Sequence, residues 1–294
     1  MEVETLIRLP GKSLMKFLCV SKTWSSIIRS QRFVASYYAA KPSRFVVALT
    51  NGVSGDPKRL FIFTGDGEEA TSSSSTYSLV ANLDMTIPSV TLPCGGYKYS
   101  SVHGFIACND VTTFIVCNPS TGQVTTFPCK ATGTCLGYDP VGDQFKALTH
   151  VTSIFDHMHN PSCFMVHEVI TLGGGGGGLV SRSRVTSPYY RPMTVGLCIQ
   201  SFQLPLSLPF AFRRSQRMIS QGTNKAGEII FSPTSLPGRA QPFYVFYFNP
   251  DTKSTRRVRI HGVADTEEFW SRHGLTGMCC VSFSPQHDDS IAFL

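Results

Sequence analysis

The sequence lacks the features that mark several large classes of protein. No Cys-x-x-Cys pair occurs among its ten cysteines, which removes the commonest signature of a structural zinc site or a thioredoxin-like redox site. No run approaches the roughly 20 apolar residues of a membrane-spanning helix. The nearest stretch, Val195 to Phe212, is interrupted by glutamines and prolines. Because 42% of the residues are apolar and only 15% are charged, the composition is that of a folded globular protein.

A secretory signal is also missing. Glu2 and Glu4 precede the first basic residue, and the apolar residues near the N-terminus are spaced rather than continuous. Cysteines such as Cys117, Cys279 and Cys280 lie within apolar runs, where we expect buried free thiols. These features predict a protein of the cytoplasm or the nucleus that binds no metal and no other cofactor.

Excess charge is confined to the start of the chain. Residues 1–44 hold eight Lys and Arg against two Glu, whereas the remaining 18 basic and 17 acidic residues nearly cancel. Such a basic segment fits nucleic acid, an anionic membrane or an acidic protein partner, and charge alone does not choose among them.

Helical spacing of apolar residues predicts three short helices in the first 40 residues. We expect the first to end at Pro10, and the second and third to begin with Ser13 and Ser21 as N-caps. Helices this short cannot bury all of their apolar side chains among themselves. The apolar positions are Val3, Leu6, Ile7, Leu14, Phe17, Leu18, Trp24, Ile27, Ile28, Phe33 and Tyr37.

From residue 45 onward, short apolar runs alternate with turn residues, a pattern typical of an all-β domain. Asx-Pro turns at Asn118, Asp139 and Asn249 each predict a hairpin, because Asn or Asp bonds the backbone that follows it while Pro fixes the next φ. Repeated hairpins suggest propeller-like blades. The predicted strands are Phe45–Leu49, Leu60–Phe63, Tyr77–Leu83, Phe114–Cys117, Gln144–Val151, Phe164–Leu172, Glu228–Phe231, Phe243–Phe248 and Arg256–Ile260.

One continuous motif runs from Leu9 to Ile28: Leu-Pro-x-Lys-Ser-Leu, then Phe-x-Cys-Val-Ser-Lys, a Trp and paired aliphatic residues. This segment resembles the F-box of plant F-box proteins, whose pattern it reproduces without gaps. Later segments look like the F-box-associated domain of type 3. These segments lie around Asn118-Pro119, Gly137–Pro140, Asn224–Ile230 and Ser282–Pro285.

The resemblance implies a mainly β fold, in which an N-terminal three-helix F-box (residues 1–40) precedes an all-β, propeller-like F-box-associated domain (residues 45–294). It also implies a substrate-recognition subunit of an SCF-type cullin ubiquitin ligase. Such a subunit binds a Skp-type adaptor, through it a cullin, and an unknown protein target, but neither nucleic acid nor membrane. The implied role is non-catalytic. The subunit acts by holding a target near the ubiquitin-loaded enzyme, which raises the effective concentration of the target there without chemistry of its own. The residues implied for the adaptor interface or its supporting core are Leu9, Pro10, Leu14, Phe17, Val20, Trp24 and Ile28.

Two features depart from the family pattern. The chain starts inside the first F-box helix, several residues later than is usual, so we expect a shortened F-box with weakened adaptor binding. Residues 197–223 do not match the strands that the family has there, which predicts that one blade is disrupted.

Two segments formally match ligand-binding motifs. The six glycines Gly173–Gly178 fit a Gly-x-Gly-x-x-Gly phosphate loop, but no Lys-Ser/Thr pair follows, so we interpret them as a hairpin loop. His157, His159 and Cys163 could supply three metal ligands, yet the same residues fit a polar surface turn.

Three alternative functions remain open from the residues. Arg256, Arg257 and Arg259 could form a nucleic-acid stripe, although alternation places Arg257 and Arg259 on one, typically solvated, strand face. A hydrolase is disfavoured by the absence of a Gly-x-Ser-x-Gly elbow. The main alternative is a β-sheet module that binds a glycan or protein ligand and carries a vestigial F-box with no ligase role. Adaptor binding separates the two readings, and the ligase role fails if Leu14, Phe17 and Trp24 are sealed against the chain's own sheets.

Overall fold

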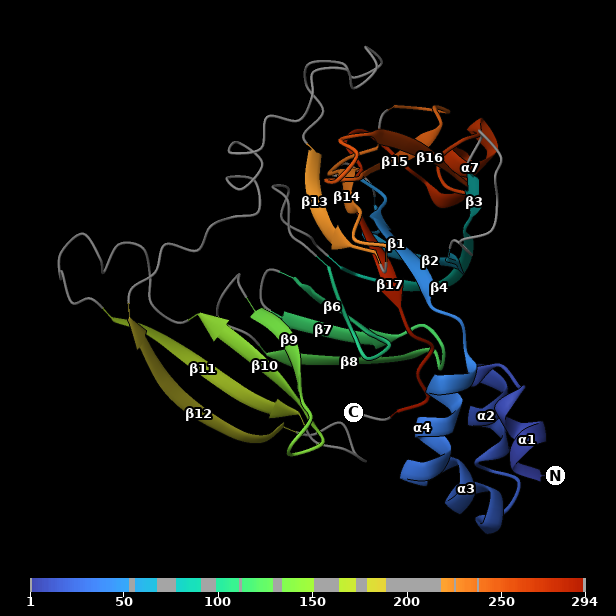
Figure 1. Ribbon diagram of the computed structural model, residues 1–294, viewed down its shortest axis with the longest axis vertical. Helices are drawn as coiled ribbons and strands as arrows, with labels where there is room; N and C mark the ends of the chain where they lie inside the picture. Colours follow the sequence, from blue (N-terminus) through green and yellow to red (C-terminus); the bar gives the residue numbers. More distant parts are fainter. Residues whose placement is uncertain are drawn as a thin grey trace. The chain divides into compact units, whose positions relative to one another are not determined.

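The computed structural model places the described residues in two compact units (Figure 1). Unit 1 contains Met1–Lys41, Ser100–Pro192 and Asp288–Leu294, and unit 2 contains Pro42–Tyr99 and Met193–His287. Each unit combines segments that are far apart in the sequence, and the predicted domain boundary between residues 40 and 45 stays a prediction. The described residues are 2–52, 56–67, 78–90, 99–110, 113–128, 134–150, 164–172, 179–188, 218–224, 226–236 and 238–292.

Residues 2–41, all of them described, form four helices rather than three: α1 (Glu2–Ile7), α2 (Gly11–Phe17), α3 (Lys22–Arg29) and α4 (Gln31–Ala40). Ser21 caps α3 as predicted, because its hydroxyl accepts the Trp24 N–H at 3.1 Å. The third predicted helix is split at Ser30. Its backbone is extended, with ψ at 137°, and its hydroxyl accepts the Phe33 N–H at 3.3 Å. A second cap therefore begins a new helix one residue after α3 ends.

The start of α2 differs from the prediction. Pro10, not Ser13, is the N-cap residue, with φ −61° and ψ 147°. Its carbonyl accepts the N–H groups of Ser13 and Leu14 at 2.9 and 3.1 Å. Proline suits this position because its ring already holds φ near the observed value.

The helices share one apolar core. No strand residue belongs to it in the described part of the chain, and its one buried member outside the helices is Ile291, near the C-terminus. Its buried members are Leu6, Leu14, Ile28, Phe33, Tyr37 and Ile291.

Two antiparallel sheets complete unit 1. The first has the order β5-β6-β7-β8 and the second β12-β11-β10-β9. Apolar side chains of both sheets form one cluster, in which Phe105 and Phe114 of the first sheet join Phe145 and Ile170 of the second. The strands are β5 (Ser100–Val102), β6 (Phe105–Asn109), β7 (Thr113–Asn118), β8 (Gln123–Pro128), β9 (Thr134–Asp139), β10 (Gln144–His150), β11 (Phe164–Leu172) and β12 (Leu179–Pro188).

Unit 2 also contains two sheets, of order β17-β1-β2-β4 and β13-β14-β15-β16-β3, the last pair being parallel. In Figure 1 the red strand β17 runs beside the blue strand β1, so the last strand completes the sheet that the first strand begins. The strands are β1 (Arg44–Thr50), β2 (Arg59–Asp66), β3 (Ser78–Val80), β4 (Asn82–Pro88), β13 (Met218–Thr223), β14 (Ile229–Pro233), β15 (Phe243–Phe248), β16 (Thr255–His261) and β17 (Val281–His287).

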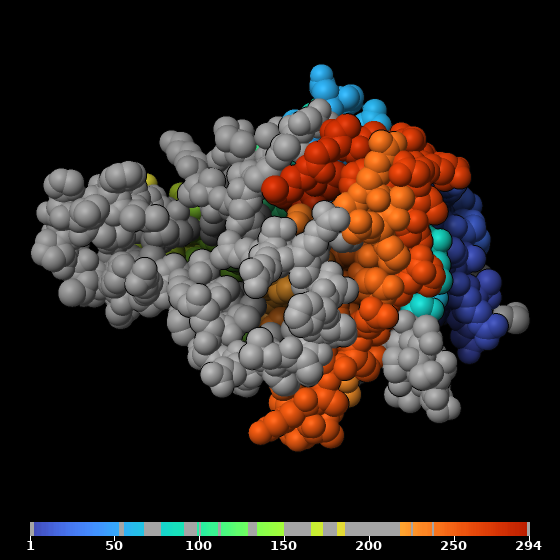
Figure 2. All heavy atoms as spheres, turned by 90° about the horizontal axis from the view of Figure 1, so that it is seen from above, coloured from blue at the N-terminus to red at the C-terminus, as the bar shows by residue number. Residues whose placement is uncertain are grey.

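One extensive core holds unit 2 together. It includes Phe45 and Phe283, whose rings stack with centroids 5.7 Å apart, and Trp270 from α7 (Glu267–His273). The orange and red atoms of the chain from β13 to β17 form one continuous body in Figure 2. The sequence analysis missed α7, whose N-cap is Thr266 and which ends at Gly274 in the left-handed conformation.

All three predicted Asx-Pro hairpins are confirmed, as β7–β8, β9–β10 and β15–β16. Asn118, Asp139 and Asn249 each accept the N–H of the second residue that follows, at 2.9 to 3.0 Å. The positive φ falls on Gly122 in the first turn, but on Asp143 and Lys253 in the other two.

Each sheet has four or five strands, and apart from the parallel pair β16–β3 the described strands pair antiparallel, as in propeller blades. The predicted mainly β, propeller-like fold is confirmed. One predicted strand is wrong in detail. In the predicted strand Tyr77–Leu83, the described residues 78–83 are divided at Ala81 between β3, which pairs with β16, and β4, which pairs with β2. The chain passes from one sheet to the other at Ala81, whose N–H still donates to the His261 carbonyl of β16 at 2.9 Å.

Candidate protein-binding surface

The seven residues predicted for a partner interface fall into classes of different exposure. Leu14 and Ile28 are both 0% exposed and lie at the centre of the helical core. Their large apolar side chains stabilise the helices against one another. Neither side chain can contact a second chain unless the helices unfold, so both stabilise the helical core.

Leu9, Phe17 and Trp24 are half-buried and pack against the edge of the same core. The rings of Phe17 and Trp24 meet edge to face, with centroids 4.9 Å apart. This pair joins the end of α2 to the start of α3. Part of each side chain stays open to solvent, so neither is sealed against the chain's sheets.

Pro10 and Val20 are exposed. Val20 lies on the connection between α2 and α3 and has 63% of its surface open, a high value for a branched apolar side chain. Its side chain is therefore accessible to a partner.

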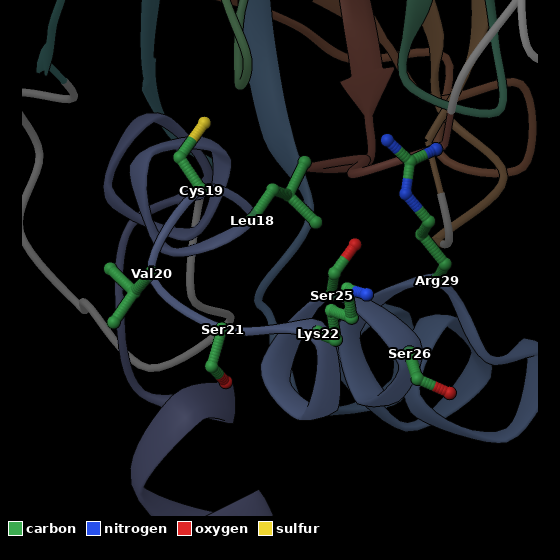
Figure 3. A pocket seen from close by; sticks show the side chains of 8 residues that line it. All are labelled: Leu18, Cys19, Val20, Ser21, Lys22, Ser25, Ser26 and Arg29. Carbon is green, nitrogen blue, oxygen red and sulfur yellow. The ribbon is translucent and has the colours of Figure 1, made fainter.

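A hollow of about 580 Å³ adjoins Val20. Figure 3 shows the side chains that line it, some from the connection between α2 and α3 and the others from α3. Leu18 and Val20 give it apolar surface, while Lys22 and Arg29 add positive charge. The lining residues are Leu18, Cys19, Val20, Ser21, Lys22, Ser25, Ser26 and Arg29.

Most residues around this hollow were not in the predicted set. Leu18 belonged to the predicted apolar face, and Lys22 to the family pattern, so both carried a signal in the sequence. Arg29 lies almost two turns beyond Lys22 on α3, and its position on the same side follows from helical geometry. We use the name α2–α3 surface for Leu9, Pro10, Phe17, Val20 and Trp24 together with this hollow.

Charge on the helices is predominantly positive and outward. Lys12, Lys16, Lys22 and Arg29 are all exposed, and Glu4 of α1 is exposed too. A positive potential over an apolar hollow favours a partner that offers apolar side chains within an acidic segment.

Cysteine placement is mixed. Cys108, Cys117 and Cys279 are buried free thiols, as predicted, whereas Cys280 is only half-buried and Cys19 and Cys135 are exposed. Burial raises the pKa of Cys108 to about 12 and that of Cys279 to about 11. These two thiols therefore stay protonated and unreactive at neutral pH.

The remaining predicted sites differ in what the structure can test. In the described ranges, no three His, Cys, Asp or Glu side chains gather as a metal site would require. His157, His159, Cys163 and Gly173–Gly178 lie outside those ranges. No described helix is long and apolar enough to cross a membrane.

The arginine stripe on β16 is largely neutralised within unit 2. Arg256 donates two hydrogen bonds to Glu228, at 3.1 and 2.7 Å, and its guanidinium lies 4.1 Å from the Tyr247 ring centroid. The Arg256 hydrogen bond also lowers the pKa of Glu228, which keeps that carboxylate charged. Arg259 approaches Asp265 at 3.8 Å. Two of the three arginines thus face carboxylates of their own unit.

Comparison with known proteins identifies both parts of the chain. The F-box domain matches residues 3–36. The F-box associated beta propeller domain matches residues 52–202 and 200–287, in two pieces that meet within the stretch predicted to depart from the family.

Similar proteins match along nearly the whole chain. F-box protein At1g30790 of Arabidopsis thaliana is 35% identical over 392 aligned residues, which cover 99% of this chain and 96% of the relative. Because that alignment is longer than the 294 residues of this chain, part of the relative has no counterpart here. Putative F-box protein At1g32660 of the same plant is 33% identical, covering 98% of this chain and 82% of the relative. The chain belongs to the family of plant F-box proteins that carry an F-box-associated β-propeller domain.

Proposed function

We propose that this protein is the substrate-recognition subunit of an SCF-type cullin ubiquitin ligase. The helical module binds a Skp-type adaptor, which in turn binds a cullin, and the β domain binds a protein target. The observation that carries the proposal is the α2–α3 surface. Its apolar groups are open within a module that matches the F-box, and basic side chains surround them.

The exposures divide the predicted interface into two roles. Pro10 and Val20, with the open edges of Leu9, Phe17 and Trp24, contact the adaptor, while buried Leu14 and Ile28 hold α2 and α3 in place. The basic rim attracts an acidic adaptor and speeds its association more than it tightens the complex.

The mechanism is scaffolding and uses no catalytic residue. A target held by the β domain is presented to the ubiquitin-loaded enzyme at a raised effective concentration. Such a subunit works in the cytoplasm or the nucleus, where the sequence predicts this protein. Nucleic acid is not part of the proposal, which is supported by the carboxylate partners of Arg256 and Arg259.

The test is binding of the full chain to a purified plant Skp-type adaptor, measured by calorimetry. We expect Val20→Asp to weaken binding at least tenfold, because burying a valine contributes about 1.5 to 3 kcal/mol and each 1.4 kcal/mol is a factor of about ten. Val124→Asp is the matched control, since Val124 is 41% exposed on β8 of the β domain. It should bind as the unaltered chain does.

Two results would overturn the proposal. One is the absence of adaptor binding by the unaltered chain, which would favour a β-sheet ligand-binding module without a ligase role. The other is equal weakening by Val20→Asp and Val124→Asp, which would show that the α2–α3 surface is not the contact.

A further inference from the structure

The chain continues past its last strand into a short segment that neither family match includes. The F-box associated beta propeller domain match ends at residue 287, where β17 also ends. Residues 288–292, which we call the tail, are described and belong to unit 1. Ser290 and Ile291 are both 0% exposed, an unusual depth for residues so near the end of the described chain.

Consecutive tail residues enter different cores. Ile291 is a member of the helical core, beside Leu14 and Ile28. Ala292 packs instead against the cluster shared by sheets β5–β8 and β9–β12. Neighbouring side chains of an extended segment point in opposite directions, so the tail lies between helices and strands and contributes to both.

Hydrogen bonds tie the tail to the turn between β7 and β8. The side-chain amide of Asn118, itself 0% exposed, donates to the Ser290 carbonyl at 3.0 Å. The Ser120 hydroxyl donates to the Asp289 carboxylate at 2.9 Å and accepts the Ser290 N–H at 3.2 Å. Buried polar groups are thereby satisfied between segments about 170 residues apart in sequence.

Helix α4 holds the other side of the tail. The Tyr38 hydroxyl donates to the His103 carbonyl at 2.9 Å and is also hydrogen-bonded to the Ser290 hydroxyl. The Tyr38 and His103 rings meet edge to face, with centroids 6.4 Å apart. Tyr38 therefore joins α4, the turn between β5 and β6, and the tail at one point.

Two glycines allow the close approach of these segments. A Cβ on Gly104 would lie 2.2 Å from the Ser290 Cβ and 2.5 Å from the Asp288 carbonyl oxygen. A Cβ on Gly11, at the start of α2, would lie 2.5 Å from the Ser120 carbonyl oxygen. Any larger residue at either position would force helix, turn and tail apart.

We propose that the tail is a clasp that fixes helices α1–α4 onto sheet β5–β8, so that the helical module and this sheet move as one body. The clasp does not depend on the proposed ligase role. If that role holds, the clasp has a consequence for it: a target bound to sheet β5–β8 stays at a fixed distance from the adaptor, which raises its effective concentration at the ubiquitin-loaded enzyme.

Hydrogen exchange on the free chain tests the clasp without any adaptor, so failure of adaptor binding would leave the result unaffected. In a chain that ends at His287, we expect amide exchange in α4 to speed up about 10- to 100-fold, because local opening no longer requires extraction of the tail. Exchange in β15 should not change, which would show that unit 2 is intact. Ile291→Ala, a milder change, should also speed up amide exchange in α4. Gln286→Ala, at an exposed position just before the tail, is the matched control and should leave amide exchange in α4 unchanged.

Gly11→Ala gives a second test, because helix propensity alone and the clasp predict opposite changes in the exchange rate of α2. Alanine has the better helix propensity, so an isolated α2 would exchange more slowly. The clasp predicts faster exchange in α2 and in the turn between β7 and β8, because the added Cβ meets the Ser120 carbonyl. Unchanged exchange in α4 after loss of the tail, or slower exchange in Gly11→Ala, would overturn the proposal.

Discussion

Strand β17 should be among the largest single contributors to the stability of unit 2, and Phe283 is the residue through which to test it. Its side chain is 1% exposed and stacks on Phe45 of β1, the strand with which β17 pairs. Phe283→Ala loses the transfer free energy of the ring, about 1.5 to 3 kcal/mol. It also loses an aromatic contact of about 0.5 to 1.5 kcal/mol and leaves a cavity. We expect a total loss of about 3 to 5 kcal/mol in the free energy of unfolding.

The two tryptophans make this loss measurable for unit 2 alone. Trp24 lies in unit 1 and Trp270, 5% exposed, lies in the core of unit 2. In a Trp24→Phe background, fluorescence during urea unfolding reports only the surroundings of Trp270. Leu83→Ala is the control: Leu83 lies on β4 of the same sheet and is 45% exposed, so its loss should stay within about 0.5 kcal/mol.

The reasoning would be refuted by a loss below about 1 kcal/mol for Phe283→Ala, because a fully buried ring cannot be removed so cheaply from a packed core. It would also be refuted if Leu83→Ala and Phe283→Ala cost the same, since burial would then not decide the outcome.

Two further predictions concern α7. Thr266→Ala should cost about 1 kcal/mol, because the Thr266 hydroxyl accepts the Phe269 N–H at 3.1 Å, and Thr266→Ser should retain that stability in the same urea assay. Burial beside Phe61, Phe63 and Phe269 and, second, the charge of Arg272 lower the pKa of His273 below its ordinary 6.5. Below pH 6.5 the unfolded chain therefore binds more protons than the folded chain. The contribution of neutral His273 to the free energy of unfolding is full above pH 6.5 and decreases as the pH falls toward the lowered pKa. In His273→Gln this part of the pH dependence should disappear; a profile that keeps the full fall would contradict the assignment.

The elements that the sequence predicted well are those specified by neighbouring residues. The Asx-Pro hairpins and the cap at Ser21 depend on atoms two or three residues apart, and all were found in place. The split at Ser30 was missed because its extended backbone interrupts an apolar periodicity that continues through Phe33 and Tyr37. Strand composition likewise could not show that Ala81 divides one apolar run between two sheets.

Long-range pairing was beyond any local pattern. β1 and β17 pair antiparallel, and the Cys280 N–H, just before β17, donates to the Thr50 hydroxyl at the end of β1, across 230 residues. The same limit applies to the α2–α3 surface. Periodicity grouped Leu14, Phe17 and Ile28 as equals, but only packing decides that Leu14 and Ile28 are covered while Phe17 keeps an open edge. Family resemblance supplied the residues, and burial separates their roles.

At Gly11 neither the family pattern nor local helix propensity explains the residue that is present. The family pattern Leu-Pro-x-Lys-Ser leaves this position open, and local chemistry disfavours glycine there, because it weakens a helix relative to alanine. The structure supplies the reason: the turn at Ser120 approaches so closely that no Cβ fits. That turn is hydrogen-bonded to the tail, whose Ile291 belongs to the same apolar core as Leu14, one turn along α2 from Gly11. A residue that costs stability within its own helix is thus explained by a contact more than 100 residues away, and substitutions at Gly11 should act on the joint with the sheet before they act on the helix.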